Sequence, residues 1–485
     1  MSRRQSGSGR AVLTALLLSL LCVAVLSPAA RADLGPATVT AGGAADPATG
    51  ALVLSPAENP AGLGKLPAPV RGKPLFPRRP GGLLQAGLDM ATAASNRVAQ
   101  GPLAQTLAAA HLDLARVPGV WAYVEPKPDQ YDWTSLDESY RAVIKAGMRP
   151  VIQLLASPGW AIGYRGGARD DGCNGQFCMQ PPSTTEYPYW ARFSGAVARR
   201  YPLAAAIEIW NEPNLWSFWH AGGVDPAAYE ALLATSYNAI KAANPAMRVL
   251  GGSINNLFTT RQQTQRDCVG VGVIKAGDCL AKYDVGYAEF LRSMLQDGAA
   301  DKMDGLSLHP YPINRTGLGL TGTFSDTQDI LTAAGAPWMR LVPSEVGVDA
   351  PSTQWPDDQS QAESTLAIYN ALSGVPAGLV VPSVSHVDAV LFFESVEVGR
   401  GFGWLTQTSR GALNPRPVYC LMADRLGSRP PQCPGRELFT DSILQAVKKV
   451  KAKAKAKAKR KSSKHKRADV ATLKSHPILF SLGPA

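Results

Sequence analysis

The sequence lacks the patterns that mark a metal centre or a membrane span. Its six histidines and seven cysteines show no regular cysteine spacing and no paired histidines beside a cysteine. Structural zinc sites need such spacing, so we expect no metal site. The apolar run at residues 11–26 is shorter than the roughly 20 residues of a membrane-spanning helix, and no later run exceeds it. We therefore expect no membrane span in the mature protein.

That short apolar run has the layout of a secretory signal. Arg3, Arg4 and Arg10 precede it, and a small-residue stretch ending at Ala32 follows it. This order predicts cleavage before Asp33 and a soluble, secreted product. A twin-arginine route is the less favoured alternative, because the residues after Arg4 are polar.

Six cysteines remain once Cys22 leaves with the signal. They fall as near neighbours: Cys173 with Cys178, Cys268 with Cys279, and Cys420 with Cys433. An even number in an exported chain favours disulfides, and neighbour pairing is the simplest of several possible schemes. Each bridge that closes such a short loop would contribute about 2 to 3 kcal/mol.

The basic charge is confined to the two ends of the chain. Twelve lysines or arginines lie between Lys448 and Arg467, and four arginines lie in the first 32 residues. Without these sixteen residues the formal net charge falls from +11 to −5. The central part is therefore mildly acidic, and any polyanion partner would have to bind the C-terminal segment, where repulsion predicts an extended tail.

Composition predicts four segments along the chain. They are the signal at residues 1–32, an Ala/Gly/Pro-rich leader at 33–80, a catalytic domain at 81–440 and a Lys-rich tail at 441–485. The leader has little periodicity, which favours a segment that is disordered or lies against the domain.

Within the central domain, short apolar runs alternate with amphipathic helical stretches. The expected strands span residues 83–88, 112–117, 148–155, 205–210, 247–251, 305–309, 339–344 and 387–393. The expected helices include residues 135–146, 187–200, 227–243, 285–295, 327–334 and 361–373. This alternation indicates parallel strands with crossover helices. Eight units predict a (β/α)₈ barrel with enlarged loops, in the α/β class, with its site at the carboxyl ends of the strands.

Two glutamates follow apolar strands of this predicted barrel. Glu212 lies in the run WNEPN and Glu345 in the run SEVG. Two such carboxyl groups can protonate a glycosidic oxygen and attack the sugar carbon behind it. Glu345 would act as an anion, whereas Glu212 would need a desolvated place to keep its proton, for which Trp210, Trp216 and Trp219 are candidates.

Several motifs in order resemble glycoside hydrolase clan A. They are WNEPNLWSFW at residues 210–219, LHPY at 308–311, SEVG at 344–347 and PRPVY at 415–419. The continuation after the WNEPN run is most similar to family 39, with family 5 a close second. The resemblance covers nearly the whole predicted barrel and implies an O-glycosyl hydrolase with a retaining mechanism.

The resemblance also implies roles for single residues. Glu212 would be the general acid/base and Glu345 the nucleophile. Asn211 would hold the sugar 2-hydroxyl, and His309 would line the sugar site. Arg116 and Tyr311 would donate hydrogen bonds to Glu345.

Aromatic residues complete the expected substrate site. Trp160, Trp216 and Phe393 lie at or just past predicted strand ends. Clan members often have a tryptophan after the eighth strand, where this chain has Phe393, so Phe393 itself or Trp404 from the next loop would take its place. A second departure is Val346 after the nucleophile, where an aromatic residue is common.

Each assignment has a plainer structural alternative. A glutamate at a strand end can be a solvated loop residue, Asn211 can cap a turn, and Arg116 can be a structural ion-pair partner. His309 and Tyr311 can be satisfied core polar residues, and the tryptophans can be packing residues.

The sequence therefore predicts a secreted retaining glycoside hydrolase that cleaves a β-linked glycoside or polysaccharide without any cofactor. The alternative is a catalytically silent barrel that binds a cell-surface glycan. The Lys-rich tail would retain the protein at an anionic cell-wall polymer. A nucleic-acid partner is not expected, because the signal directs the chain out of the cell.

Overall fold

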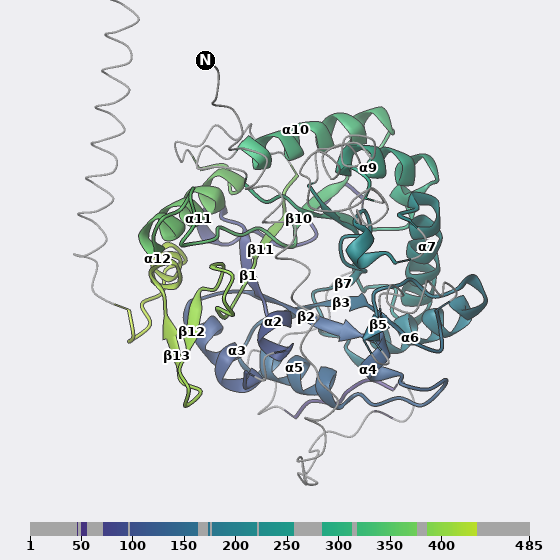
Figure 1. Ribbon diagram of the computed structural model, residues 1–485, viewed down its shortest axis with the longest axis horizontal. Helices are drawn as coiled ribbons and strands as arrows, with labels where there is room; N and C mark the ends of the chain where they lie inside the picture. The colour runs from purple at the N-terminus through teal and green to yellow at the C-terminus, as the bar shows by residue number, and fades with distance from the viewer. Residues whose placement is uncertain are drawn as a thin grey trace, which may run out of the picture. The chain divides into compact units, whose positions relative to one another are not determined.

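The computed structural model describes residues 46, 50–55, 71–95, 98–162, 173–174, 177–220, 223–256, 284–312, 318–375 and 386–433 (Figure 1). The expected signal, most of the leader, the loop with Cys268 and Cys279, and the Lys-rich tail lie outside these residues. The chain divides into two compact units after Pro430, ahead of the expected boundary at residue 440, and the first unit holds the barrel.

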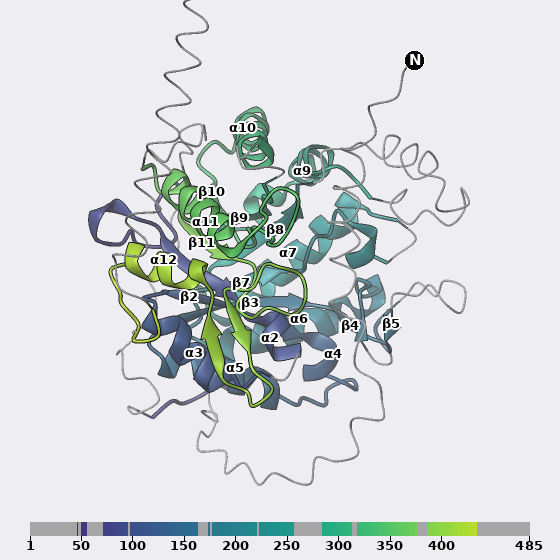
Figure 2. The same cartoon turned by 60° about the vertical axis from the view of Figure 1, so that its left-hand side comes forward.

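Eight parallel strands form one sheet that curves into a ring (Figures 1 and 2). They are β1 (Gln85–Asp89), β2 (Leu114–Val120), β3 (Arg149–Leu155), β7 (Ala206–Ile209), β8 (Val249–Asn255), β9 (Gly305–His309), β10 (Arg340–Pro343) and β11 (Ala389–Phe392). Their order in the sheet follows the chain, with β11 paired to β1. A parallel bridge from Leu341 to Val387 joins the β10 and β11 sides. The predicted (β/α)₈ barrel is confirmed.

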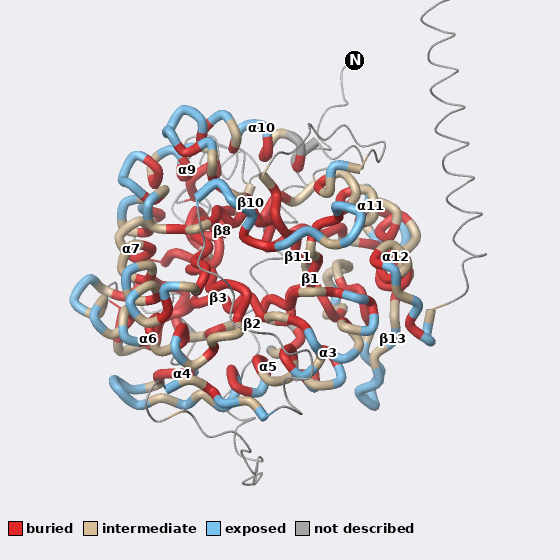
Figure 3. The backbone as a smooth tube through the Cα atoms, turned by 180° about the vertical axis from the view of Figure 1, so that it is seen from behind, coloured by how far each residue is buried: buried red, intermediate tan, exposed pale blue. Residues whose placement is uncertain are grey.

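Helices alternate with these strands and surround the ring (Figure 1). They are α3 (Gln100–Ala109), α5 (Thr134–Lys145), α6 (Tyr187–Arg200), α7 (Pro226–Ala243), α9 (Tyr287–Gln296), α10 (Leu318–Ala333), α11 (Asp358–Leu372) and α12 (Pro417–Arg425). Figure 3 shows buried backbone in the central strands and exposed backbone on the outer helices. Among the described residues no helix is both long and apolar enough to span a membrane.

Smaller elements follow the carboxyl ends of the strands. They are α2 (Ala91–Ser95), α4 (Trp121–Val124), η5 (Trp216–Phe218), the small sheet of β4 (Ser157–Pro158), β6 (Phe177–Cys178) and β5 (Cys173–Asn174), and the hairpin of β12 (Leu405–Gln407) and β13 (Leu413–Pro415). Three further 3₁₀ turns are η3 (Pro80–Gly82), η4 (Thr184–Glu186) and η7 (Ala299–Asp301).

Local sequence signals explain where several helices begin. The Asp225 side chain accepts hydrogen bonds from the N–H groups of Ala227 and Ala228, and Pro226 occupies the first turn of α7. Asp357 and Ser360 form a reciprocal capping box at the start of α11. These caps satisfy N–H groups that a helix cannot bond internally, so both helices begin within three residues of the predicted positions.

Several elements extend beyond their predicted residues, and α10 and β2 illustrate the reasons. Helix α10 begins at Leu318, although its glycine-rich first half predicts a loop and the expected helix began at residue 327. Leu320 and Phe324 are buried there, and their packing outweighs the weak helix propensity of glycine. Strand β2 continues to Val120, so Arg116 lies inside the strand rather than at its end.

The amino-terminal end of the barrel is closed by residues from the expected leader. Leu75 and Phe76 are 3% and 2% exposed and share a core cluster with Leu114, Val151 and Val342. Burying two large side chains there contributes a few kcal/mol. The barrel core therefore includes Leu75 and Phe76.

Acidic residues just ahead of three strands are each matched with one cation at this end. The pairs are Arg79 with Asp113 at 2.6 Å, Lys241 with Asp304 at 2.7 Å, and Arg340 with Asp388. Each aspartate also accepts a backbone N–H, so its charge is balanced locally. Such pairing satisfies polar groups beside an apolar core.

Disulfides occur where the neighbour scheme predicts them. Cys420 is bonded to Cys433, which confirms that pair. Cys178 is also disulfide-bonded, and it lies opposite Cys173 in the register of β5 and β6. The proposed pair Cys268 and Cys279 lies outside the described residues.

Candidate active site

The barrel brings the two candidate glutamates to one place. Glu212 lies three residues after β7 and Glu345 two residues after β10. Ligand atoms of Glu212, His309 and Glu345 all lie within 4.8 Å of one another. All three side chains are at least nine-tenths buried. Two carboxyl groups therefore face each other across a small space.

Glu345 is surrounded by hydrogen-bond donors. Tyr311 Oη donates to Glu345 Oε2 at 2.8 Å, and Arg116 donates to Glu345 Oε1. His309 Nδ1 lies 3.6 Å from Oε2. Burial raises the pKa of Glu345, but His309, Arg116 and Tyr311 together outweigh it and lower that pKa. Glu345 is thus held as an anion, the state a nucleophile needs.

Arg116 is shared by three carboxylates. Its Nε donates to Glu208 Oε2 at 2.7 Å. Its Nη1 donates both to Asp89 Oδ2, at 2.8 Å, and to Glu345 Oε1. Asp89 lies opposite Arg116 in the β1–β2 register. Burial, and next the charge of Glu345, raise the pKa of Asp89 despite Arg116. The cluster holds more acid than base.

The two carboxylate oxygens of Glu212 differ in their hydrogen bonds. Its Oε1 accepts from Asn255 Nδ2 and from His309 Nδ1, both at 2.8 Å. Its Oε2 has no hydrogen-bond partner among the described residues. Oε2 is therefore the oxygen that can carry a proton to a substrate atom.

His309 connects the two sides of the site. Its Nε2 lies 3.0 Å from Ser253 Oγ, while its Nδ1 bonds Glu212. Burial lowers the pKa of His309, but the carboxylates of Glu345 and Glu212 outweigh burial and raise it. A protonated ring donates from both nitrogens, which agrees with these contacts.

Asn211 is oriented by two donors. Gln153 Nε2 donates to Asn211 Oδ1 at 2.7 Å, and Arg116 donates to the same oxygen at 3.1 Å. Because the oxygen is occupied, the Asn211 amide nitrogen is the group that can meet a substrate hydroxyl. This arrangement agrees with the expected sugar contact, which stays a prediction.

The backbone around Glu212 has an uncommon conformation. Trp210, Glu212 and Ser253 have φ values of 72°, 40° and 49°. Non-glycine residues rarely adopt this region, and such strain persists only where the surroundings impose it. Here the Glu212 N–H donates to Ser253 O at 3.0 Å, which holds the turn after β7 against β8.

Most of the predicted tryptophans pack within the protein. Trp210 and Trp219 are fully buried and belong to a row of aromatic rings with Trp190 and Tyr229. Trp210 packs edge-on against Trp190 of α6, and Trp219 packs edge-on against Tyr229 of α7. The packing alternative therefore holds for both. The hydrogen-bond partners of Glu212 are Asn255 and His309, and the apolar surroundings expected for it stay a prediction.

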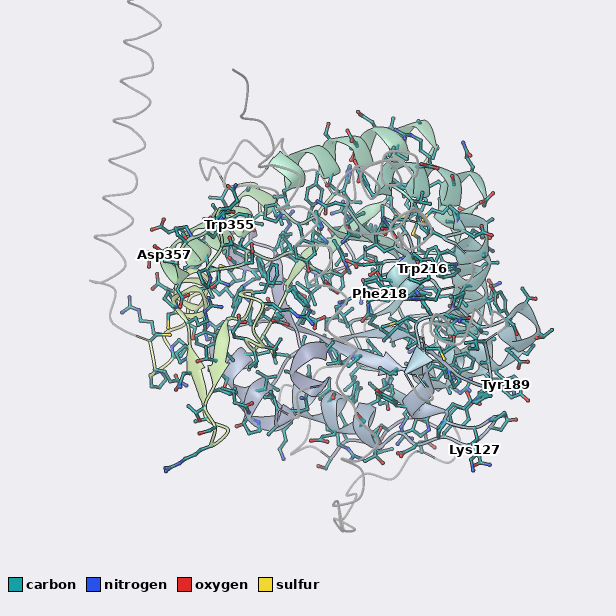
Figure 4. All side chains as sticks on the ribbon, in the orientation of Figure 1. Lys127, Tyr189, Trp216, Phe218, Trp355 and Asp357 are labelled. Atoms are coloured by element: carbon teal, nitrogen blue, oxygen red, sulfur yellow. The ribbon has the colours of Figure 1, made fainter. Side chains whose placement is uncertain are left out.

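Trp160 and Trp216 differ in burial. Trp216 is 4% exposed and lies on the turn η5 near Phe218, toward the middle of Figure 4. Trp160 is half-buried and packs edge-on against Trp121 and against Tyr189, which lies at the edge of Figure 4. Their predicted sugar contacts stay predictions.

A buried aspartate holds the turn after β7. Asp284 accepts the backbone N–H of Trp216 at 2.7 Å. Burial, and to a smaller degree the charge of Glu212, raise the pKa of Asp284 to about 7 despite that hydrogen bond. Asn214 bonds both Asn255 and Val285, so the same turn also positions the amide that contacts Glu212.

Three aromatic rings gather beside the nucleophile. The ring centroid of Phe393 lies 6.4 Å from that of Tyr311. The ring centroid of Phe402 lies 5.9 Å from that of Tyr311 and 5.5 Å from that of Phe393, and all three pairs are edge to face. Phe393 and Phe402 are half-buried. Trp404, expected as a replacement platform, is instead buried 5.1 Å from Phe392. The burial of Trp404 favours a packing role over the expected platform role.

Sequence reasoning missed several members of the site. They are Asp89, Gln153, Glu208, Ser253, Asn255 and Phe402. Asp89 ends an apolar strand, the same signal that identified Glu345. The others carry no such signal, since their importance depends on which strand lies beside which.

The three residues Glu212, His309 and Glu345 have the spacing of a possible metal site. Their atoms already bond one another, Arg116, Tyr311 and Asn255. The positive charge that the carboxylates require is thus supplied by Arg116 and His309. This donor set suits proton transfer and nucleophilic attack better than metal binding.

No protein-family model matches the chain. Solved structures with a similar fold include a family 39 β-xylosidase from Caulobacter crescentus, with 18% identity, a TM-score of 0.50 and coverage of 76% of this chain and 74% of that one. A family 39 enzyme from Xanthomonas axonopodis pv. citri has 16% identity, a TM-score of 0.50 and coverage of 76% and 68%.

A third similar structure is a family 39 glycoside hydrolase from the gut symbiont Bacteroides cellulosilyticus WH2. It has 18% identity and a TM-score of 0.49, with coverage of 73% of this chain and 63% of that one. The chain thus spans less than two thirds of that protein. At these identities the likeness concerns the fold, which is that of family 39 structures.

Proposed function

We propose that the protein is a secreted retaining glycoside hydrolase acting on a β-linked glycoside or polysaccharide. The observation that carries the proposal is the facing pair Glu212 and Glu345, with ligand atoms within 4.8 Å. Retaining glycosidases have carboxyl groups about 5 to 5.5 Å apart, whereas inverting enzymes leave roughly 6.5 to 9.5 Å for a water. The short separation favours direct attack by Glu345.

In the first step a Glu345 oxygen attacks the anomeric carbon. The bond from that carbon to the glycosidic oxygen breaks, and the oxygen takes the proton from Glu212 Oε2. The product is an ester between Glu345 and the sugar, with Glu212 left as an anion. His309 and Asn255 then donate to the negative Glu212 Oε1 and stabilise it.

In the second step water attacks the anomeric carbon. Glu212 takes the proton from this water, the ester bond breaks, and Glu345 leaves as a carboxylate. Arg116 and Tyr311 stabilise that returning charge. The Asn211 amide would hold the 2-hydroxyl through both transition states.

A direct test replaces Glu345 with glycine. The Glu345→Gly variant should lose hydrolysis of aryl β-glycosides, and added azide or formate should restore turnover of an activated glycoside. Retained activity, or failure of every external nucleophile, would show the nucleophile assignment to be wrong. Glu208→Gln, another buried glutamate in the Arg116 cluster, is the matched control and should show no azide rescue.

Substrate class can be tested with a panel of 4-nitrophenyl β-glycosides and plant or bacterial polysaccharides. The β-xylosidase among the similar folds makes the β-D-xyloside the first compound to try. Hydrolysis of any member supports the enzyme. Tight glycan binding with no hydrolysis across the panel would instead support the silent barrel.

Export and retention rest on the sequence alone. The signal at residues 1–32 supports secretion, and the Lys-rich tail supports electrostatic retention at an anionic wall polymer. Deleting the chain from Lys448 onward should release the protein into the medium without changing its turnover. Unchanged retention would remove the tail from the proposal.

A further inference from the structure

The loop after β11 is folded around one carboxylate. Glu397 Oε1 accepts the backbone N–H groups of Gly399, Arg400 and Gly401 at 2.7, 2.6 and 2.9 Å. Glu397 Oε2 accepts the N–H of Gly403 at 3.0 Å. Backbone donors converging on one anion fix the path of the chain from residue 397 to 403.

Arg416 fastens this loop to the barrel. It donates to Glu397 at 3.0 Å and to the carbonyls of Gly401 and Gly403 at 3.1 and 2.7 Å. It also reaches Asp358 at 2.8 Å, at the start of α11. Arg416 is 7% exposed, so these bonds are largely shielded from water.

A third side chain holds the peptide of Phe402 itself. Gln361 Nε2 lies 3.2 Å from Phe402 O and 2.8 Å from Gly401 O. From the other side, a Cβ placed on Gly347 would come within 2.7 Å of the Phe402 ring. Only glycine at residue 347 allows the ring to approach the strand end that carries Glu345. Phe402 is therefore placed by contacts on several sides.

All this bonding fixes one partly open ring next to Tyr311, the residue that bonds the nucleophile. We propose that Phe402 and Phe393 together form the apolar wall of the sugar subsite, and that Glu397 and Arg416 are positioning residues that act through Phe402. The inference rests on the proposed glycosidase function. The wall replaces the tryptophan expected after the eighth strand with two smaller rings from two segments.

The wall also predicts a substrate preference. A phenyl ring offers no hydrogen-bonding atom, so it suits a pyranoside face that presents C–H groups. A sugar with an axial hydroxyl pointing at the wall would leave that hydroxyl without a partner. We therefore expect β-xylosides and β-glucosides, whose hydroxyls are all equatorial, to be preferred over epimers with an axial hydroxyl on that side.

The test uses steady-state kinetics of the full chain with 4-nitrophenyl β-D-xyloside and β-D-glucoside. Phe402→Leu should raise KM roughly three- to tenfold with a smaller change in kcat, because an apolar contact to the bound sugar is lost. Phe402→Trp should restore KM to within about twofold of the unaltered protein, because it renews the aromatic surface. Phe76→Leu, the same change at the far end of the barrel, should leave KM unchanged.

The positioning role is tested by a double-mutant cycle. Glu397→Gln should raise KM in the same direction as Phe402→Leu, and the double variant should be no worse than Phe402→Leu alone, because both act on one contact. Additive effects on KM would remove Glu397 as a residue that acts through Phe402. An unchanged KM in folded Phe402→Leu would overturn the wall itself.

The outcomes separate this inference from the proposed function. Absence of hydrolysis by the unaltered protein across the glycoside panel contradicts the enzyme. Hydrolysis that is insensitive to Phe402 contradicts only the wall. If thermal unfolding shows that Phe402→Leu does not fold, the KM of Glu397→Gln decides, and an unchanged value in that variant would overturn the inference.

Discussion

The two ends of the barrel differ in how their acidic side chains are paired with cations. At the amino-terminal end, each aspartate ahead of a strand is matched by one cation and one backbone N–H, around the apolar pair Leu75 and Phe76. At the carboxyl end, the single guanidinium of Arg116 pairs with Asp89, Glu208 and Glu345 at once. One end gives each of these aspartates a cation of its own, whereas the other gathers several acids around one arginine.

This difference separates stability from chemistry. Balanced pairs beside an apolar core favour the folded state and leave no group ready to react. Excess buried acid costs folding free energy, but it also places side by side carboxyl groups whose pKa values differ, raised for Asp89 and lowered for Glu345. Substitutions at the two ends should therefore differ in kind, and the four predictions below run from the largest expected effect to the smallest.

The largest effect is expected at the carboxyl end. Glu212→Ala removes the proton donor, so kcat/KM for glycosides with a sugar leaving group should fall about a thousandfold or more. Glycosides with a 4-nitrophenyl leaving group need no protonation and should lose far less in the first step. Kinetics with both leaving groups measure the difference. Equal losses would contradict the acid role, and the free energy of unfolding should not fall.

At the opposite end, Phe76→Ala should change stability alone. The variant leaves a cavity under the barrel, which should cost about 3 to 5 kcal/mol of unfolding free energy. Denaturant unfolding gives this value, and kcat/KM at 25 °C should stay within about twofold because the site is remote. A large kinetic effect in the folded variant would break the separation between the two ends.

The same substitution, Asp to Asn, should act oppositely at the two ends. The pKa of Asp284 is raised to about 7, so between its ordinary pKa and pH 7 the folded state binds more protons than the unfolded state. Stability of the unaltered protein therefore falls as pH rises through this window. Asp284→Asn removes this pH dependence. The free energy of unfolding of the variant, relative to that of the unaltered protein, should therefore be about 2 to 3 kcal/mol higher at pH 8 than at pH 5.

Asp388→Asn is the counterpart at the amino-terminal end. It leaves Arg340 without its anion, so it should lower stability at every pH between 5 and 8. Thermal unfolding across this range, for both variants and the unaltered protein, gives the comparison. Parallel curves for Asp284→Asn and the unaltered protein would show that Asp284 does not titrate as described.

The smallest of these effects is expected for Tyr311→Phe. The phenol hydrogen bond helps to lower the pKa of Glu345, so its loss should raise that pKa. Because Glu345 reacts as an anion, the acid limb of the kcat/KM profile should move to higher pH. At the optimum the rate should fall roughly 10- to 100-fold, as expected for a hydrogen bond to a charged group. An unmoved acid limb would contradict the assignment.

The barrel and its two glutamates could be predicted because their signals are local. An apolar run followed by a glutamate is visible in the sequence at both positions. Eight apolar runs with helical stretches between them predict a (β/α)₈ barrel. The charge cluster was not predictable in the same way. Asp89 and Arg116 lie side by side only because β1 pairs with β2 in one register, and Glu208 joins them from β7, two strands from β2 in the sheet.

Two other features escaped prediction for a similar reason. Phe76 looks like part of a low-complexity leader, and only closure of the ring gives it a core to fill. Phe402 stands in a glycine-rich stretch typical of a flexible loop, yet Glu397 supplies the bonds that order it. In both cases the contacts join residues whose own sequence neighbours carry no sign of them.

The turn that carries Glu212 has one further consequence. With φ at 40°, Glu212 adopts a shape that glycine takes at little cost and other residues resist. Selection of variants for thermal stability alone would therefore favour replacement of this glutamate. The selected variants would be more stable and would lack activity. Engineering campaigns on this protein should select on turnover from the first round.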